Sequence, residues 1–288
     1  MCSSFDLNFS NFENRKINYL KMKTILVPTD FSENAYKALE YASYLASQIG
    51  AKIVVLNSYQ IPSGTSNVMI NFADILEKDS KEDLAKLLDK LKNIEDFKGV
   101  EYIPFSCYGF LTQTIEIASK NHSIDLIVMG TTGASNIKNK IFGSNTLATI
   151  KVVDYPIVVV PQETQFSAWK NVILASNEDD SILAVAQKLN DIVGLENVNM
   201  DIVSVVPKNE QKADHATLIL GLDGYNAQYS FHTEENDSVV EGVLNYTENH
   251  ASNIIVLHKK SYSFLEGLMH SSVTKKLAMH SKKPLLII

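Results

Sequence analysis

The sequence alternates between short apolar runs and longer amphipathic segments, and this alternation limits the folds open to it. Five apolar runs in the first half, each four to seven residues long, are typical of buried strands. Strands that alternate with helices predict a parallel sheet with helices on both of its faces. The five predicted strands are Thr24–Thr29, Lys52–Ser58, Val100–Ser106, Asp125–Met129 and Ile157–Val160.

Two of the segments between these strands have the apolar spacing of helices. Ser32 is well suited to cap a helix whose apolar residues recur at intervals of three, four and seven. Those residues are Ala35, Ala38, Leu39, Ala42, Leu45, Ala46 and Ile49. A longer helix near Phe72–Lys92 is expected to bury a leucine stripe and to expose its charges. The stripe consists of Leu76, Leu84, Leu87, Leu88 and Leu91.

The second half of the chain repeats the first. The run that begins at Lys170 matches the run at Lys23, 147 positions earlier, whereas Pro284 matches Pro156, 128 positions earlier. The second copy is therefore 19 residues shorter, and we expect the loss in its second helix, after Pro207. The predicted organisation is a polar arm (1–21), a first domain (22–162) and a second domain (168–288). Trp169, in the connection, is expected to pack at the junction.

Two motifs in the first half lie where predicted strands end. The first strand runs into Pro28-Thr29-Asp30-Phe31-Ser32, and the fourth is followed by Gly130, Gly133 and Gly143-Ser144-Asn145. Glycine lets a ligand approach the backbone closely, and a Gly-Ser pair at a helix start offers free N–H groups to phosphate. The spacing is neither the dinucleotide fingerprint nor the P-loop. The alternative interpretation is an ordinary turn with chance glycines.

The two motifs, in this order, resemble those of the ATP-binding branch of the universal stress protein family. The resemblance implies an α/β fold of two tandem flavodoxin-like (adenine nucleotide alpha hydrolase-like) domains. Each would be a five-stranded parallel sheet of order 3-2-1-4-5 with helices on both faces, and the two would pair through their last strands. In such sheets a ligand sits where the strand order reverses, here between strands one and four.

The resemblance also implies an adenine nucleotide site in the first domain, for ATP with or without Mg²⁺. Its implied residues are Pro28, Thr29 and Asp30 at the nucleoside, Ser58 at the base, Met129, Gly130, Thr132 and Gly133 along the ribose and phosphates, and Gly143, Ser144 and Asn145 at the phosphates. Many relatives have Val where this chain has Ser58. Lys138 and Lys140 either reach the phosphates or lie on a solvated loop, and Asp30 either contacts ligand or forms a turn.

The second copy has lost these motifs. Asn177 stands where Asp30 would be, and the three glycines are replaced by His258, Ser261 and Ser271, with Ser272 at the Ser144 position. We expect the added Cβ atoms to narrow the loop and to remove easy access to positive φ. The second domain is therefore predicted not to bind ATP in the same way. His258 and His270 could form a metal or anion site, but drift at an abandoned site is favoured.

Composition narrows the function classes. A net charge of −7 and a pI near 5.5 argue against nucleic-acid binding. Two cysteines predict neither a disulfide framework nor a metal cluster, and no apolar run approaches the ~20 residues that span a bilayer. A cytoplasmic protein without membrane contact is predicted.

Three functions fit this sequence. The first is a nucleotide-dependent switch in a stress response that acts on a protein partner. Such a switch could also form a homodimer. The second is a weak ATP hydrolase, with Asp30 the only carboxylate placed at the site and no catalytic residue assigned. The third is an interaction module that binds no nucleotide.

Overall fold

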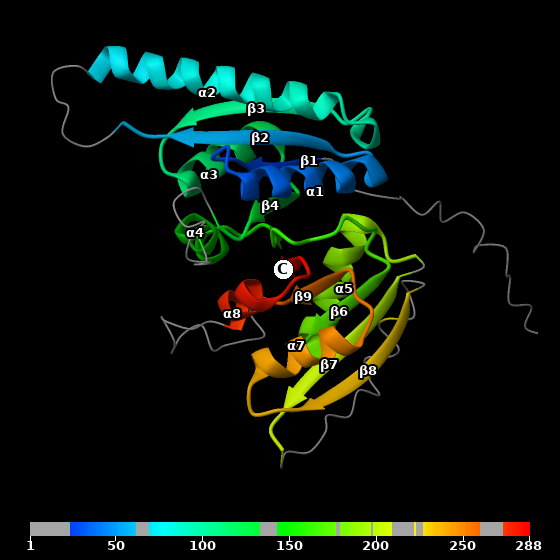
Figure 1. Cartoon of the computed structure of the whole chain (residues 1–288). Coiled ribbons are helices and arrows are strands. Elements are labelled where there is room, and N and C mark those ends of the chain that lie inside the picture. The colour runs from blue at the N-terminus through cyan, green and yellow to red at the C-terminus, as the bar shows by residue number, and fades with distance from the viewer. Residues whose placement is uncertain are drawn as a thin grey trace, which may run out of the picture.

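The structure is a computed structural model that describes residues 24–61, 69–132, 143–176, 179–196, 198–208, 222, 227–259 and 273–288. The predicted arm, residues 1–21, lies outside these ranges. The first half comprises β1 (Thr24–Pro28), α1 (Glu33–Ile49), β2 (Lys52–Tyr59), α2 (Met69–Lys92), the 3₁₀ turn η2 (Glu95–Phe97), β3 (Tyr102–Tyr108), α3 (Leu111–His122), β4 (Leu126–Gly130), α4 (Ser144–Val152) and β5 (Ile157–Val160). The second comprises β6 (Asn171–Ala175), α5 (Asp179–Val193), β7 (Asn199–Val206), β8 (Gln228–Glu235), α7 (Val239–Asn249), β9 (Ile254–Leu257), α8 (Val273–His280) and β10 (Leu285–Ile287) (Figure 1).

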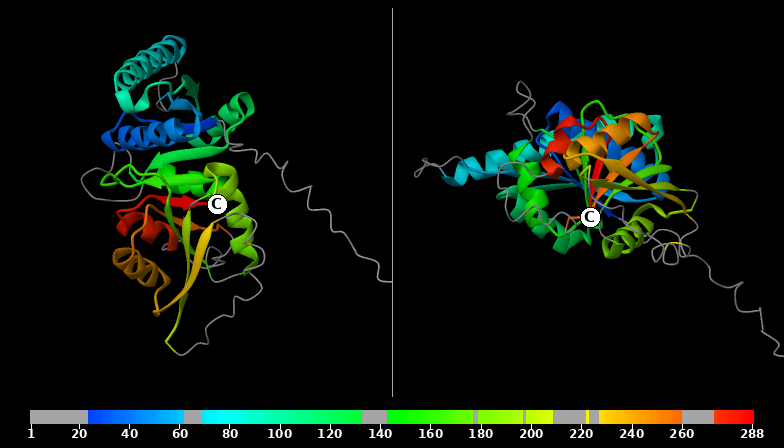
Figure 2. Two further views of the ribbon diagram at one scale, coloured as in Figure 1. Left: turned by 90° about the vertical axis from the view of Figure 1, so that its right-hand side faces the viewer. Right: turned by 90° about the horizontal axis from the view of Figure 1, so that it is seen from below.

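The ten described strands form one continuous sheet of order β3-β2-β1-β4-β5-β10-β9-β6-β7-β8. Within each half the strands are parallel and follow the order 3-2-1-4-5, so the predicted fold class is confirmed. The halves meet where β5 and β10 pair antiparallel, with Val158 opposite Leu286. In the left panel of Figure 2 the red β10 lies against the green strands of the first half.

Alternate residues of most strands point into two large cores, while Ile173, Val203 and Tyr246 form a third, small cluster. Ile25 and Val27 belong to the core covered by α1, α2 and α5, whereas Leu26 belongs to the core covered by α3, α4, α7 and α8. Both cores pass through the β5–β10 seam, since Leu286 lies in the first and Leu285 in the second. The two halves therefore share their hydrophobic interior.

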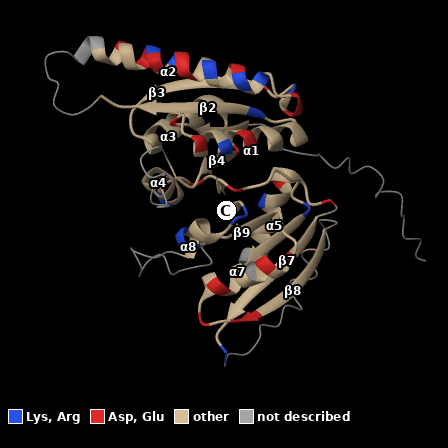
Figure 3. Ribbon diagram, viewed as in Figure 1, with Lys and Arg blue, Asp and Glu red and all other residues tan. Residues whose placement is uncertain are grey.

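The two predicted helices form with small differences in extent. Ser32 caps α1 as expected, because its Oγ accepts a hydrogen bond from the backbone N–H of Ala35 at 3.2 Å. α2 begins at Met69, before the predicted start, and four of its five predicted leucines are buried while Leu76 is half-buried. Its outer face carries alternating acidic and basic residues, as Figure 3 shows.

The second copy is shorter between its second and third strands. Residues 60–101 separate β2 from β3, whereas only residues 207–227 separate β7 from β8. On either side of this connection the repeat is regular: Asn171 follows Thr24 by 147 positions, and Leu285 follows Ile157 by 128. The predicted shorter helix after Pro207 itself lies largely outside the described residues. β3 also begins two residues later than predicted and extends to Tyr108, because its pairing with β2 continues as far as Tyr59.

The connection between the halves packs against α1. Trp169 is 5% exposed, and its indole Nε1–H donates to the hydroxyl of Tyr41 at 2.7 Å, so its predicted place at the junction is confirmed. The ring of Phe166 stacks on Tyr44, with centroids 6.1 Å apart, and the Nζ of Lys37 lies 3.9 Å from the Phe166 centroid. The first helix thus holds the connection in place through aromatic contacts.

Tyr41→Phe is expected to lower the free energy of unfolding by about 1–3 kcal/mol. The change removes one hydroxyl and leaves the buried indole N–H of Trp169 without its acceptor. Urea denaturation followed by Trp169 fluorescence measures the effect. Tyr44→Phe is the matched control, because it keeps the ring that stacks on Phe166. Equal stability losses in the two variants would contradict the importance of this hydrogen bond.

In the part of the chain that the structure describes, no helix combines the length and the apolar character that crossing a membrane requires.

Candidate functional site

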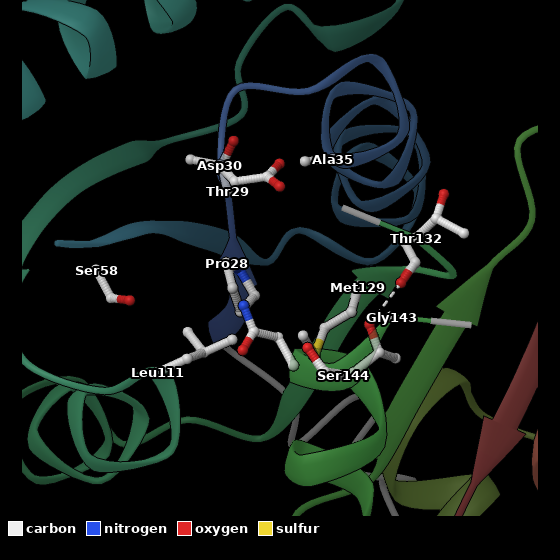
Figure 4. Close-up of a pocket in the computed structure, with 13 residues that line it drawn as sticks. Pro28, Thr29, Asp30, Ala35, Ser58, Leu111, Met129, Thr132, Gly143 and Ser144 are labelled. Atoms are coloured by element: carbon white, nitrogen blue, oxygen red, sulfur yellow. Dashed lines mark hydrogen bonds between the residues drawn. The ribbon is translucent and has the colours of Figure 1, made fainter. Parts of the chain in front are cut away.

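A pocket opens at the carboxyl ends of β1 and β4, where the strand order of the first half reverses. Its unfilled space, open mouth included, is about 690 Å³. The lining residues are Pro28, Thr29, Asp30, Ala35, Ser58, Leu111, Met129, Gly130, Thr132, Gly143, Ser144, Asn145 and Thr146 (Figure 4). Ten of the eleven residues predicted from the sequence are brought together here. The eleventh, Gly133, lies outside the described residues, as do Lys138 and Lys140.

The wall formed by the end of β1 is held by a buried polar chain. The backbone N–H of Thr29 donates to the carbonyl of Leu56, and its own carbonyl accepts from Asn57 Nδ2, each at 2.8 Å. Asn57 in turn accepts from the hydroxyl of Ser80, on α2, at 2.7 Å. The pocket wall is therefore fixed to both β2 and α2. Sequence reasoning missed Asn57, which looks like an ordinary polar residue near a strand end.

Asp30 shapes the turn after β1 and also lines the pocket. Its Oδ1 accepts the backbone N–H of Ser32 at 3.1 Å, while Thr29 Oγ1 accepts that of Phe31 at 3.0 Å. These bonds hold Phe31 at a φ of 62°, a region that aromatic residues seldom adopt. The turn and ligand interpretations of Asp30 are thus compatible, because the same carboxylate can serve the fold and face the pocket.

Gly130 is required by packing. A Cβ at this position would lie 2.8 Å from Nδ2 of Asn34 and 2.9 Å from its backbone oxygen. Asn34 is 2% exposed, and its Nδ2 donates to the carbonyl of Thr132 at 2.7 Å, so it joins the first turn of α1 to the loop after β4. Sequence reasoning missed Asn34, whose contacts lie almost a hundred residues away.

The prediction that these glycines supply positive φ is wrong for the two that the structure describes. Gly130 does not have a positive φ, and Gly143 has an ordinary φ of −63°. The physical reason is that the chain leaves β4 in an extended conformation and enters α4 through an extended residue. What glycine contributes at Gly130 is the missing Cβ, which allows the close contact with Asn34.

The start of α4 faces the pocket with backbone donors. Gly143 precedes the helix, and no side-chain cap from this residue occupies the first-turn N–H groups, which are therefore suited to a ligand. Two bonds fix this end: Gly143 N–H donates to the carbonyl of Thr131 at 2.8 Å, and Thr146 Oγ1 donates to that of Gly130 at 2.9 Å. With the positive end of the helix dipole, Ser144 and Asn145 form an environment suited to an anion.

The described residues include no group of three or more His, Cys, Asp or Glu side chains that could hold a metal ion. Asp30 is the only carboxylate among the described lining residues. Chemically, the pocket therefore offers backbone donors, hydroxyls and apolar surface from Leu111 and Met129, with a single acidic group.

The second half differs at the corresponding place. Ile127 pairs with Ile157 in the first half and Ile255 with Leu285 in the second, so His258 follows β9 where Gly130 ends β4. The second half does retain one supporting contact, because Ser204 Oγ donates to the carbonyl of Ser176 at 2.8 Å, as Asn57 does to Thr29. Asn177, Ser261, His270, Ser271 and Ser272 lie outside the described residues.

The part of the chain that forms this pocket is similar to known proteins. Residues 21–161 match the model of the universal stress protein family. The universal stress protein Slr1230 of Synechocystis sp. is 24% identical over 92% of this chain and 99% of its own length. Universal stress protein MJ0531 of Methanocaldococcus jannaschii is 27% identical over 48% of this chain and 81% of its own. Residues 21–161, the part of the chain that forms the pocket, therefore match the universal stress protein family, and Slr1230 extends the similarity over 92% of the chain.

A solved structure has the same fold over most of the chain. The crystal structure of a universal stress protein from Archaeoglobus fulgidus DSM 4304 superposes with a TM-score of 0.69 at 19% identity, covering 93% of this chain and 97% of that one. Both sheet halves of this chain therefore fall within one known architecture.

Proposed function

We propose that the first half of the chain binds an adenine nucleotide, ATP or a close relative, and that the protein acts as a nucleotide-dependent regulator of a stress response in the cytoplasm. One observation carries the proposal. The end of β1 and the uncapped start of α4 converge on one pocket at the point where the strand order reverses. The match of residues 21–161 to the universal stress protein family supports the same assignment.

The lining suggests how the ligand would lie. Leu111 and Met129 offer apolar surface for a base, with Ser58 and Thr29 as polar neighbours. The phosphates would lie at the first turn of α4, against Ser144 and Asn145. Because Asp30 is the one described lining carboxylate, Mg²⁺ accompanying the nucleotide would be held mainly by phosphate oxygens and water.

Mass spectrometry of the nucleotide released when freshly purified protein is denatured tests the proposal. We expect about one adenine nucleotide per chain, since His258 and its neighbours replace the second motif. Two per chain would contradict the assignment of a single site. None, even after incubation with millimolar ATP, would favour the nucleotide-free interaction module.

The variant Ser144→Asp tests phosphate binding separately from nucleoside binding. Ser144 is exposed at the first position of α4, where a negative charge stabilises the helix but repels phosphate. We expect ATP affinity to fall by about tenfold or more, a loss of ~1.4 kcal/mol, with adenosine affinity unchanged. Isothermal titration calorimetry with both ligands measures this, and Ser144→Asn is the uncharged control of similar size. Unchanged ATP affinity in Ser144→Asp would rule out phosphate binding at α4.

A hydrolase would convert ATP to ADP, whereas a switch would keep its bound nucleotide unchanged. We expect nucleotide to be retained rather than turned over, because a single lining carboxylate offers no separate base and metal ligand. Incubation of the loaded protein followed by quantification of ADP measures this. Multiple turnovers that disappear in Asp30→Asn would support the enzyme instead.

A further inference from the structure

A lysine from the second half contacts the helix whose other end lines the pocket. Lys259 Nζ donates to the carbonyl of Val153 at 3.1 Å, immediately after the last residue of α4. The same ammonium lies 3.5 Å from the carboxylate of Asp154. Figure 1 shows α4 beside the chain's C-terminus, although the two belong to different halves.

The backbone of Lys259 is itself fixed. Its N–H donates to the carbonyl of Ile288 at 2.6 Å, and Ile288 N–H donates to the carbonyl of Leu257 at 2.9 Å. The Lys259 side chain is 29% exposed, whereas that of Asp154 is fully exposed. The contact with the Val153 carbonyl is therefore the better shielded of the two, and the Asp154 ion pair contributes little.

Lys259 also occupies an informative position in the repeat. With the 128-residue offset set by the strand register, it corresponds to Thr131 of the first half. The carbonyl of Thr131 accepts from Gly143 and so closes its own loop. In the second half the side chain of the corresponding residue, Lys259, reaches across the β5–β10 seam to the end of α4.

α4 is short enough for its two ends to be coupled. Its nine residues span only about 13 Å, and a helix of this length is marginal without tertiary contacts. The start is fixed by Thr146 and Gly143, and the far end receives the positive charge of Lys259 at the carbonyl that directly follows the last helical residue. Loss of the far contact would let α4 populate arrangements in which Ser144 and Asn145 no longer line the pocket.

We propose that Lys259 is a positioning residue for the nucleotide site, acting across the seam through α4. The proposal rests on the proposed function, because it assigns α4 to the phosphates. It also gives the second half a definite role in nucleotide binding. The loop after β9, which has no glycine at the position of Gly130, holds the far end of the first half's phosphate helix.

Calorimetry with ATP on the full chain tests the proposal. Lys259→Met keeps the apolar stem and removes the charge, and we expect affinity to fall by about 5- to 30-fold. Lys259→Arg should restore affinity to within about threefold of the original, since it keeps a donor and the charge. Lys282→Met, which removes an exposed lysine of the second half, is the matched control and should have no effect. Equal affinity in Lys259→Met and Lys282→Met would overturn the proposal.

Amide hydrogen exchange of the free protein provides a second readout that needs no nucleotide. In Lys259→Met we expect faster exchange in residues 144–153 than in the original chain, with β6 and β7 unchanged. Unchanged exchange in α4 would overturn the positioning role. If the original chain bound no ATP at all, the proposed function would fail by itself, and the exchange experiment would still decide whether Lys259 restrains α4.

Discussion

Gly130→Ala is expected to lower the free energy of unfolding by about 1–3 kcal/mol and to weaken nucleotide binding by about tenfold or more. The new Cβ would lie 2.9 Å from a backbone oxygen and 2.8 Å from the amide nitrogen of Asn34. A backbone atom cannot rotate away, so α1 or the end of β4 must move. Either movement disturbs the bond between Asn34 and the carbonyl of Thr132 and widens the pocket.

Urea denaturation and ATP titration of the same preparation measure the two effects of Gly130→Ala. Lys282→Ala is the control, because it truncates an exposed side chain of the second half. It should leave first-half affinity within about twofold and the stoichiometry at one nucleotide per chain. A Gly130→Ala protein with full stability and full affinity would contradict the packing argument.

Leu286→Ala is expected to lower the free energy of unfolding by about 2–5 kcal/mol and to destabilise both halves together. Leu286 is fully buried, pairs with Val158 across the seam, and belongs to the core that α1, α2 and α5 share. Because both cores are continuous, unfolding should remain one cooperative transition. Trp169 fluorescence and far-ultraviolet circular dichroism should therefore give the same midpoint.

The control for Leu286→Ala is Val152→Ala. Val152 is 60% exposed, and truncating it should change stability by less than about 0.5 kcal/mol. Two separate transitions in Leu286→Ala would show that the halves unfold independently and that the seam is not a shared core.

The strands could be predicted from local sequence, and the place of the pocket from two local motifs together with the strand order that the family resemblance implies. Apolar runs such as Ile157–Val160 are buried on both faces of the sheet and carry their own signal. The motifs at Asp30 and Gly143 mark strand and helix ends, and the topology of a parallel sheet then brings them together.

The residues that support the pocket could not be predicted in this way. Asn34 contacts Thr132, Asn57 contacts Ser80, and Lys259 contacts Val153. These contacts join residues 98, 23 and 106 positions apart, and asparagine or lysine at such places is common on any surface. The need for glycine at Gly130 could not be predicted either, because the atoms that exclude a Cβ belong to Asn34 in α1.

The antiparallel pairing of β5 with β10 also bears on how the two copies could diverge. Expressed alone, the first half would present Ile157–Val160 as an open apolar edge, a template for self-association. Within the chain, a connection of ten residues, 161–170, keeps the complementary edge at a local concentration on the order of millimolar. The partner is thus supplied by covalent linkage at every protein concentration. One copy can then lose its ligand-binding residues, while the other copy keeps the strand that pairs with its open edge.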